Sequence, residues 1–423
     1  MPIVRKTIFL FLLFSFIYPV IWNFFPVAFS RIMGVVGLIY AIVYIKSNFV
    51  SVQYRNIVIG YAILIIIAIF QSAINDAFDV EFVKHVLIIP LLNYFGALLL
   101  YVIVGKEGHT FGRLCDYILM IALFQAIISF AMFISPELSN SIFSLIHYEQ
   151  NVVDLHESLT HRLMGIGQAF WGAGINYGVD LLILAVLPDV KGSFINKYKI
   201  LYWTIAAIII LAGILSARTF FISFIFVFLY FIMMRKNIFT IIVNSYKYIL
   251  IIPIFLFLYQ FVETQMGTRF EKVESHAYEL FNNYEESGEL ESSSTNKLRN
   301  MYDIIPSETK TWIIGDGKFK NEDGSYYMYT DIGYFRQIFF YGLIGLFIFL
   351  IVVIYVYRKC IKQYTNPAIR IFLFLLLLFE LTLNLKALAA LTTYLGLFLA
   401  WGIMNRNKEH ENVINKAIIE HKI

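Results

Sequence analysis

The stretch Ile314-Gly315-Asp316-Gly317-Lys318-Phe319, continued by Thr330-Asp331-Ile332-Gly333-Tyr334-Phe335-Arg336 and Phe340-Tyr341-Gly342-Leu343-Ile344-Gly345, closes the one long polar segment of an otherwise apolar chain. An apolar run begins directly after it, at Ile338. Polar side chains therefore meet the edge of a bilayer here, and Asp331 and Arg336 lie about one helical turn apart. We expect this stretch to form the rim of a functional site at a membrane surface.

The composition places the whole chain in a membrane. Of its 423 residues, 59% are hydrophobic and only 15% are charged, whereas a soluble domain is about half apolar and a quarter charged. The 41 Phe and 28 Tyr residues suit lipid-facing and interfacial positions. The fold classes of soluble domains are thereby excluded, and the expected fold is an all-α, polytopic membrane bundle.

Apolar runs of about the length that a helix needs to cross a bilayer recur along the chain. The first follows Arg5 and Lys6, is long for a signal-peptide core and has no small-residue cleavage site after it, so we expect it to be retained. The pattern predicts about twelve transmembrane helices. They lie near residues 7–25, 31–45, 56–74, 86–104, 115–134, 169–187, 200–216, 219–234, 248–262, 333–357, 369–384 and 387–404.

These runs divide the chain into four parts. Residues 1–262 hold helices one to nine, 263–331 form a large loop domain, 332–404 hold helices ten to twelve, and 405–423 form a tail. Such a long loop is typical of a functional segment or of disorder. We expect it to be partly helical, with a short helix at 296–305 and extended pieces at 312–314 and 326–329 around a turn at 321–324.

Lys and Arg residues are distributed unequally between the two sides of the predicted bundle. They crowd the loops and tail on the side of the N-terminus, whereas the short loops of the other side hold only Arg31, Lys84, Arg162, Arg218 and Lys386. By the positive-inside rule, both termini are then cytoplasmic and the large loop is outside.

Four arginines on the outer side are candidates for binding a phosphate group. Arg218 stands in Leu-Ser-Ala-Arg-Thr at 215–219, between two apolar runs with almost no loop between them. Its guanidinium can hold a phosphate by a bidentate, charge-assisted pair, or it can extend to lipid headgroups. Arg162 and Arg336 border apolar runs and have the same two interpretations. Arg299 lies on the short loop helix, where a solvated charge is the simpler interpretation.

Asp331 is the carboxylate at the point where the polar loop re-enters the membrane. A carboxylate beside a low-dielectric region suits a general base. The alternative is a helix N-cap, because Asp331 directly precedes an apolar helix. Asp180 and Glu380 stand inside apolar runs and are further candidates, with a structural pairing as their alternative. No ligand-rich cluster, P-loop or dinucleotide fingerprint occurs, so neither a metal nor another cofactor is expected.

In their order along the chain, these features resemble the O-antigen polymerases (Wzy-type), a family related to O-antigen ligases and other C-type glycosyltransferases. The resemblance rests on the many spans, Leu-Ser-x-Arg at 215–218, an arginine helix in a large outer loop, Gly-x-Gly at 315–317, Thr-Asp-x-Gly-Tyr at 330–334 and Gly-Leu-Ile-Gly at 342–345. In ligases of this architecture a His stands where the loop re-enters the membrane. Asp331 in that place fits the polymerase branch better.

The resemblance implies a metal-independent glycosyltransferase of the bacterial inner membrane, with its active site facing the periplasm. It would transfer the growing undecaprenyl-pyrophosphate-linked glycan onto a new lipid-linked repeat unit. Asp331 would activate the acceptor hydroxyl, and Arg218, Arg299, Arg162 and Arg336 would bind the pyrophosphate. The implied partners are the lipid-linked oligosaccharide, the bilayer and a polysaccharide chain-length regulator, with no nucleic acid.

Two other functions remain open at this point. One is an O-antigen ligase, which would use the same lipid-linked donor and a different acceptor. The other, from a different class, is a lipid-linked oligosaccharide flippase or other transporter. Such a transporter is expected to carry internal repeats, and the sequence shows none.

Overall fold

The protein is described by a computed structural model that covers residues 3–45, 48–77, 79–105, 108–147, 162–168, 170–234, 260, 263–264, 279, 282–285, 288 and 291–420. These residues form helices, turns and isolated β-bridges, and no β-strand occurs among them. The all-α prediction is thereby confirmed. The chain folds into two compact units that alternate along the sequence: Met1–Ser30, Val104–Ser292 and Asn366–Leu376 form the first, and Arg31–Ile103, Ser293–Thr365 and Leu377–Ile423 form the second.

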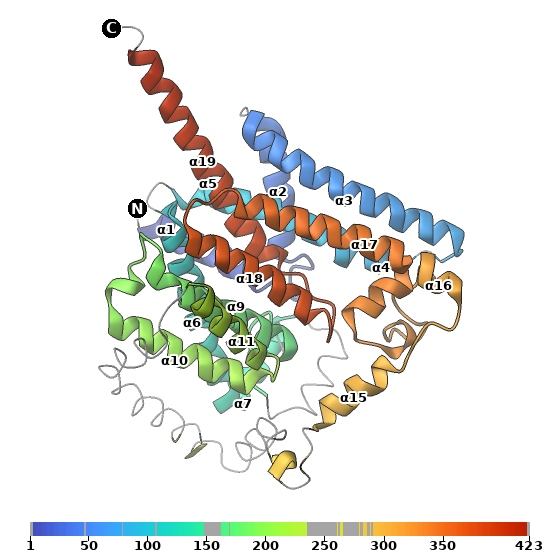
Figure 1. Cartoon of the computed structure of the whole chain (residues 1–423). Coiled ribbons are helices and arrows are strands. Elements are labelled where there is room, and N and C mark those ends of the chain that lie inside the picture. Colours follow the sequence, from blue (N-terminus) through green and yellow to red (C-terminus); the bar gives the residue numbers. More distant parts are fainter. Residues whose placement is uncertain are drawn as a thin grey trace. The chain divides into compact units, whose positions relative to one another are not determined.

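The first unit is built around α9 (Phe170–Val186), in which every residue from Tyr177 to Val186 is buried. This helix packs against α6 (Phe111–Ile134), α10 (Lys199–Ser216) and α11 (Phe220–Met233), as Figure 1 shows in green. A helix that is apolar on all sides is stable only when other helices or lipid surround it. The remaining elements of the unit are α1 (Ile3–Ile17), α7 (Pro136–Leu145), the 3₁₀ turns η3 (Leu187–Asp189) and η4 (Ile195–Lys197), and the first part of α18 (Pro367–Leu383).

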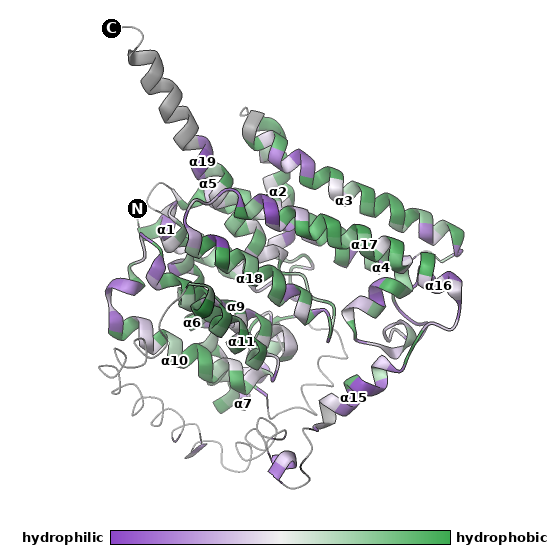
Figure 2. Cartoon of the chain, viewed as in Figure 1, coloured by the Kyte–Doolittle hydropathy of each residue, from purple (hydrophilic) through white to green (hydrophobic). Residues whose placement is uncertain are grey.

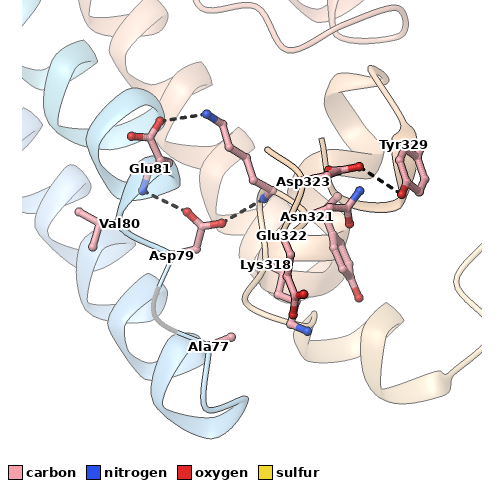
Figure 3. A pocket seen from close by; sticks show the side chains of 11 residues that line it. Ala77, Asp79, Val80, Glu81, Lys318, Asn321, Glu322, Asp323 and Tyr329 are labelled. Atoms are coloured by element: carbon pink, nitrogen blue, oxygen red, sulfur yellow. Dashed lines mark hydrogen bonds and ion pairs between the residues drawn. The ribbon is translucent and has the colours of Figure 1, made fainter. Parts of the chain in front are cut away.

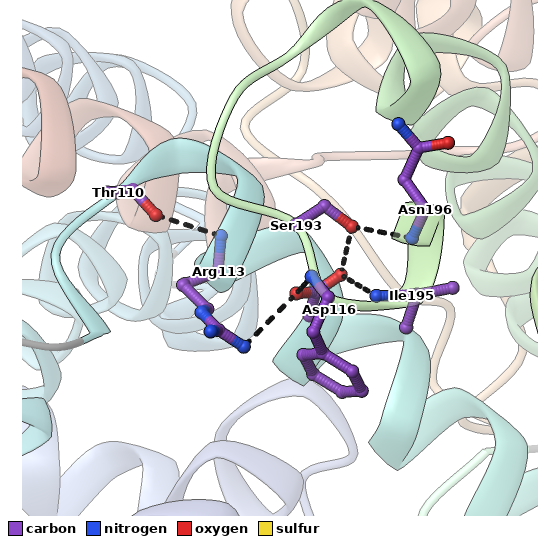
Figure 4. Close-up of polar contacts among 7 residues, drawn as sticks. Thr110, Arg113, Asp116, Ser193, Ile195 and Asn196 are labelled. Carbon is purple, nitrogen blue, oxygen red and sulfur yellow. Dashed lines mark hydrogen bonds and ion pairs between the residues drawn. The ribbon is translucent and has the colours of Figure 1, made fainter. Parts of the chain in front are cut away.

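A buried carboxylate holds the loop between α9 and α10. Asp116 of α6 is fully buried and accepts hydrogen bonds from the Ser193 hydroxyl at 2.6 Å, the Phe194 N–H at 2.6 Å and the Ile195 N–H at 3.4 Å (Figure 4). The guanidinium of Arg113 lies 3.9 Å from the same carboxylate. Asp116 is therefore satisfied by its own scaffold, and we assign it a structural role.

The second unit is organised on α17 (Gly333–Ile361). Figure 1 shows α3 (Asn48–Ile74) lying alongside it, and α19 (Thr392–Glu420) also packs against both helices. The remaining elements are α2 (Phe29–Tyr44), α4 (Val80–Phe82), the π-helical turn η1 (Val83–Ile88), α5 (Ile89–Val104), α15 (Ser293–Tyr302), α16 (Thr309–Ile314), the 3₁₀ turn η6 (Tyr327–Tyr329) and the second part of α18.

Among the described residues, six helical segments are long and apolar enough to cross a membrane: Val50–Ile74, Val80–Val104, Phe111–Ile134, Phe170–Asp189, Lys199–Ser216 and Gly333–Ile361. Figure 2 shows the apolar surface of α3 and α17 and the polar character of α15. The predicted membrane-embedded character is thus supported, while the number of crossings stays a prediction. The helix expected at 7–25 ends at Ile17, and the run at 248–262 lies outside the described residues except for Gln260.

Two glycines let the loop after α16 contact the backbone of α17. Gly342 interrupts α17 with a φ of 67° and a ψ of −172°, and Gly315 directly after α16 has a φ of 75°. The N–H of Asp316 donates to the carbonyl of Phe339 at 2.7 Å, and the N–H of Gly317 donates to the next carbonyl at 3.1 Å. A break in a helix leaves carbonyls without intrahelical partners, and this loop supplies those partners. The Gly-x-Gly pattern at 315–317 and the Gly-Leu-Ile-Gly pattern at 342–345 therefore contribute to one backbone contact between the loop after α16 and α17. We call this contact the α16–α17 joint.

A side chain at Gly342 is expected to disrupt this joint. A Cβ there would overlap the carbonyl of Ile313, and the backbone angles of Gly342 belong to a region that is essentially restricted to glycine. We expect Gly342→Ala to lower the unfolding temperature of the purified protein sharply, because about 1–3 kcal/mol of backbone strain adds to the overlap. Gly324→Ala is the matched control, because Gly324 has a φ of 81° and a Cβ there meets nothing within 4 Å. Equal unfolding temperatures of the two variants would show that the backbone contact at Gly342 does not stabilise the protein.

The polar segment before α17 departs from the prediction in two places. Residues 312–314, predicted as extended, belong to α16, where the indole of Trp312 donates to the Pro306 carbonyl at 2.9 Å. The turn at 321–324 is confirmed, because Lys320 and Tyr326 form an antiparallel bridge across it. Residues 327–329 then form the 3₁₀ turn η6 instead of a strand. The helix predicted at 296–305 corresponds to α15, which ends at Tyr302.

Candidate functional site

Residues Thr330 to Tyr334 connect the polar segment to α17, and most of them hold the connection in place. The hydroxyl of Thr330, which is fully buried, accepts a hydrogen bond from the Ile332 N–H at 3.3 Å. Gly333 lies so close to Asn384 that a Cβ would stand 2.6 Å from its Oδ1. The Tyr334 hydroxyl donates to a backbone carbonyl of α18 at 2.8 Å. Thr, Gly and Tyr of the Thr-Asp-x-Gly-Tyr pattern thus have structural roles.

Asp331 has no such role among the described residues. Its side chain is half-buried and makes no hydrogen bond or ion pair with any residue that the structure describes. Helix α17 begins at Gly333, its N-cap residue is Ile332, and no side chain caps it. The N-cap interpretation of Asp331 is therefore wrong, because Thr330 supplies the oxygen at this turn. A half-buried carboxylate without a structural task is available to act on a ligand.

Arg336 lies in an aromatic slot near the start of α17. Its guanidinium carbon is 3.6 Å from the ring centroid of Tyr326 and 4.1 Å from that of Phe319. The side chain is only 7% exposed, and the carboxylates of Asp331 and Asp79 are close enough to interact with its charge. A guanidinium stacked on two rings is firmly positioned. This geometry does not fit an arginine that extends to lipid headgroups.

Arg299 lies exposed in the last turn of α15. One turn later on the same side of this helix, Tyr302 donates to the Leu385 carbonyl and its ring packs against Phe335 with 5.7 Å between centroids. Burial raises the pKa of Tyr302. Arg299 is therefore carried by a helix that is anchored directly at the start of α17.

Arg162 and Arg218 come together in the first unit. The N–H of Leu163 donates to the Leu215 carbonyl at 3.0 Å, which ties the two segments to each other. Nη2 of Arg218 lies 2.8 Å from Oε2 of Glu279, and these side chains are 10% and 23% exposed. Burial lowers the pKa of Arg162, Arg218 lowers it further, and Glu279 opposes both effects. Two guanidinium groups thus lie in one cluster, and a guanidinium can bind a phosphate by a bidentate, charge-assisted pair.

The junction that carries Arg218 is as tight as predicted. Helix α10 ends at Ser216 and α11 begins at Phe220. Gly174 of α9 allows this close packing, because a Cβ there would lie only 2.8 Å from the Cβ of Ala217. The position of Arg218 is thus fixed by three packed helices.

The predicted site residues fall into two groups, one in each unit. Arg162 and Arg218 belong to the first, and Arg299, Asp331 and Arg336 belong to the second. Glu279, Phe319 and Tyr326 were not anticipated from the sequence. Phe319 and Tyr326 lie on either side of the predicted turn, so pairing the two arms of this turn would have placed their rings close together. No sequence pattern indicated Glu279. Among the described residues, no group of three His, Cys, Asp or Glu side chains could hold a metal ion.

Comparison of the chain with family models, with curated proteins and with solved structures finds no match.

Proposed function

We propose that the protein is a polysaccharide (O-antigen) repeat-unit polymerase, a C-type glycosyltransferase that uses an undecaprenyl-pyrophosphate-linked donor. The observation that carries this proposal is the environment of the Asp331 carboxylate, that is, its burial and its contacts. Thr330 and Tyr334 of the same segment make hydrogen bonds to backbone groups. The Asp331 carboxylate is half-buried and makes no hydrogen bond or ion pair with a described residue. It lies close enough to the guanidinium of Arg336 to interact with its charge.

The proposed reaction uses these groups in two roles. Asp331 removes the proton from the acceptor hydroxyl as its oxygen attacks the anomeric carbon of the donor glycan. The bond from this carbon to the pyrophosphate oxygen breaks, and undecaprenyl pyrophosphate leaves with the bonding electrons. A pyrophosphate leaving group needs cations more than it needs a general acid. Arg162, Arg218, Arg299 and Arg336 are the proposed cations, and direct displacement would invert the anomeric centre.

The proposed setting is the bacterial inner membrane, with about twelve helices, both termini in the cytoplasm and the segment 263–331 in the periplasm. The six apolar helical segments and the uneven distribution of Lys and Arg support this arrangement. The proposed partners are the lipid-linked oligosaccharide, the bilayer and a polysaccharide chain-length regulator.

The surface polysaccharide of a strain that lacks this chain tests the function. We expect the polymer to disappear while a single repeat unit remains on the surface. Polymer that is retained on its lipid carrier but missing from its final acceptor would instead indicate a ligase. Loss of every repeat unit from the surface would indicate a flippase, and either result would overturn the proposal.

A further inference from the structure

The second unit contains a polar pocket that the proposed reaction does not yet use. Its volume is about 810 Å³, within the range of about 300–1,000 Å³ that is typical of small-molecule sites. Figure 3 shows side chains from the start of α4 on one wall and from the hairpin at 318–329 on the other. The lining combines charged and amide side chains with the apolar surface of Ala77, Val80 and two tyrosine rings, which suits an amphipathic ligand.

Hydrogen bonds fix the two walls against each other. One carboxylate oxygen of Asp79 accepts from the Glu81 N–H at 3.1 Å. The other accepts from the N–H groups of Phe319 at 2.8 Å and Lys320 at 3.0 Å. The Lys320 ammonium in turn lies 3.5 Å from the Glu81 carboxylate. The pocket is thus preorganised, which lowers the cost of binding.

Three lining side chains remain available to a ligand. Lys318 and Glu322 are exposed and make no hydrogen bond or ion pair with any described residue. The ring of Tyr329 is 67% exposed, and its backbone has a left-handed φ of 55°. Its hydroxyl lies 3.4 Å from the Asp323 carboxylate, so the ring is presented by a constrained turn.

These groups match a polyhydroxylated ligand. A sugar hydroxyl both donates and accepts, so one face of a pyranose can satisfy a carboxylate and an ammonium group together. An exposed aromatic ring can cover the apolar face of the same sugar. The charged side chains of the lining sum to −2, which disfavours an anionic ligand: they are Asp79, Glu81, Glu322, Asp323, Lys318 and Lys320. A pyrophosphate group would be repelled here.

Asp331 is not itself a lining residue, but it follows the pocket lining closely in the chain. Tyr329, which lines the pocket, precedes Asp331 by two residues. Two residues of chain span at most about 7 Å between Cα atoms. A sugar bound against Tyr329 would therefore lie within reach of the Asp331 segment.

We propose that this pocket binds a pyranose residue of the acceptor glycan that carries no acidic group, and that it thereby presents an acceptor hydroxyl to Asp331. The assignment rests on the proposed polymerase function. It specifies in addition that the sugar carrying the reacting hydroxyl is uncharged. Lys318, Glu322 and Tyr329 are the residues that contact this sugar.

Steady-state kinetics of the purified full-length protein with lipid-linked repeat units tests the assignment. We expect Lys318→Gln and Glu322→Gln each to raise KM about 10–100-fold with little change in kcat, because each loses a charge-assisted hydrogen bond to the acceptor. The matched controls Lys310→Gln and Glu308→Gln change exposed residues of the same segment outside the pocket lining and should leave KM unchanged. If both pocket variants are active and keep the wild-type KM, the pocket does not bind the acceptor sugar, while the polymerase proposal is unaffected.

A binding measurement separates the pocket from the catalytic proposal. The probe is the repeat-unit oligosaccharide released from its lipid, compared with the same oligosaccharide after oxidation of its primary hydroxyls to carboxylates. We expect the oxidised form to bind at least about 10-fold more weakly, and Glu322→Gln to recover part of the loss. Equal binding of the two forms, or a native repeat unit that is itself acidic at this position, would contradict the assignment. If wild-type protein binds the oligosaccharide through this pocket but forms no polymer, the polymerase proposal fails and the pocket remains.

Discussion

Asp331→Asn is expected to reduce polymerisation of lipid-linked repeat units by about 10²–10⁴-fold, the range that is typical for loss of a general base. Asn has nearly the size and shape of Asp but cannot take a proton from the acceptor hydroxyl. The side chain of Asp331 makes no hydrogen bond with a described residue, so we expect the unfolding temperature to fall only slightly, through the lost attraction to Arg336. The measurement is kcat of purified protein at equal protein concentration, together with KM for the lipid-linked unit.

The control for this experiment is Asp303→Asn, which removes an exposed carboxylate between α15 and α16. It should behave as wild type in both kcat and unfolding temperature. Near-normal polymerisation by Asp331→Asn would mean that this carboxylate is not the base. Attention would then move to Asp180 and Glu380, of which Glu380 is buried and already accepts a hydrogen bond from the Tyr357 hydroxyl at 2.6 Å.

The helices could be predicted because a bilayer requires long apolar runs, and such runs are visible in one sequence. The break at Gly342 could not be predicted in this way. It lies inside an apolar run, where a single glycine is compatible with a continuous helix. The break depends on a tertiary contact, in which the loop after α16 supplies the N–H groups that the interrupted helix lacks.

The site could be predicted in part. The chemical type of each charged residue and its position beside an apolar run can be read from the sequence, and these features make Asp331, Arg162 and Arg218 candidates. The N-cap alternative for Asp331 is wrong because α17 begins at Gly333 after Ile332, and the Tyr334 N–H at this start donates to the Asn384 carbonyl at 3.2 Å. That contact joins residues far apart in the sequence, and no local pattern reports it.

A second large effect is expected at Arg218. Arg218→Lys should lower the polymerisation rate about 10–100-fold, because an ammonium is a point charge and cannot form the bidentate pair that a guanidinium forms with a phosphate. Lys keeps the positive charge opposite Glu279, so this variant should stay folded. Arg218→Ala should be less active still, and it should also be less stable, because it leaves the Glu279 carboxylate without the ion pair seen at 2.8 Å.

Glu279→Gln distinguishes a phosphate-binding Arg218 from one that only pairs with its neighbour. If Arg218 binds pyrophosphate, Glu279 competes with this ligand for the guanidinium, so Glu279→Gln should polymerise at the wild-type rate or faster and bind inorganic pyrophosphate more tightly. If the ion pair is only structural, Glu279→Gln should lower both activity and unfolding temperature, whereas Arg218→Lys, which keeps a positive charge opposite Glu279, should stay close to wild type in both. The pairing is partly exposed, with 10% and 23% of the two side chains accessible, so the solvent moderates its contribution to stability. The activity difference between these two variants is therefore the decisive readout, and an Arg218→Lys enzyme with wild-type activity would remove Arg218 from the proposed pyrophosphate site.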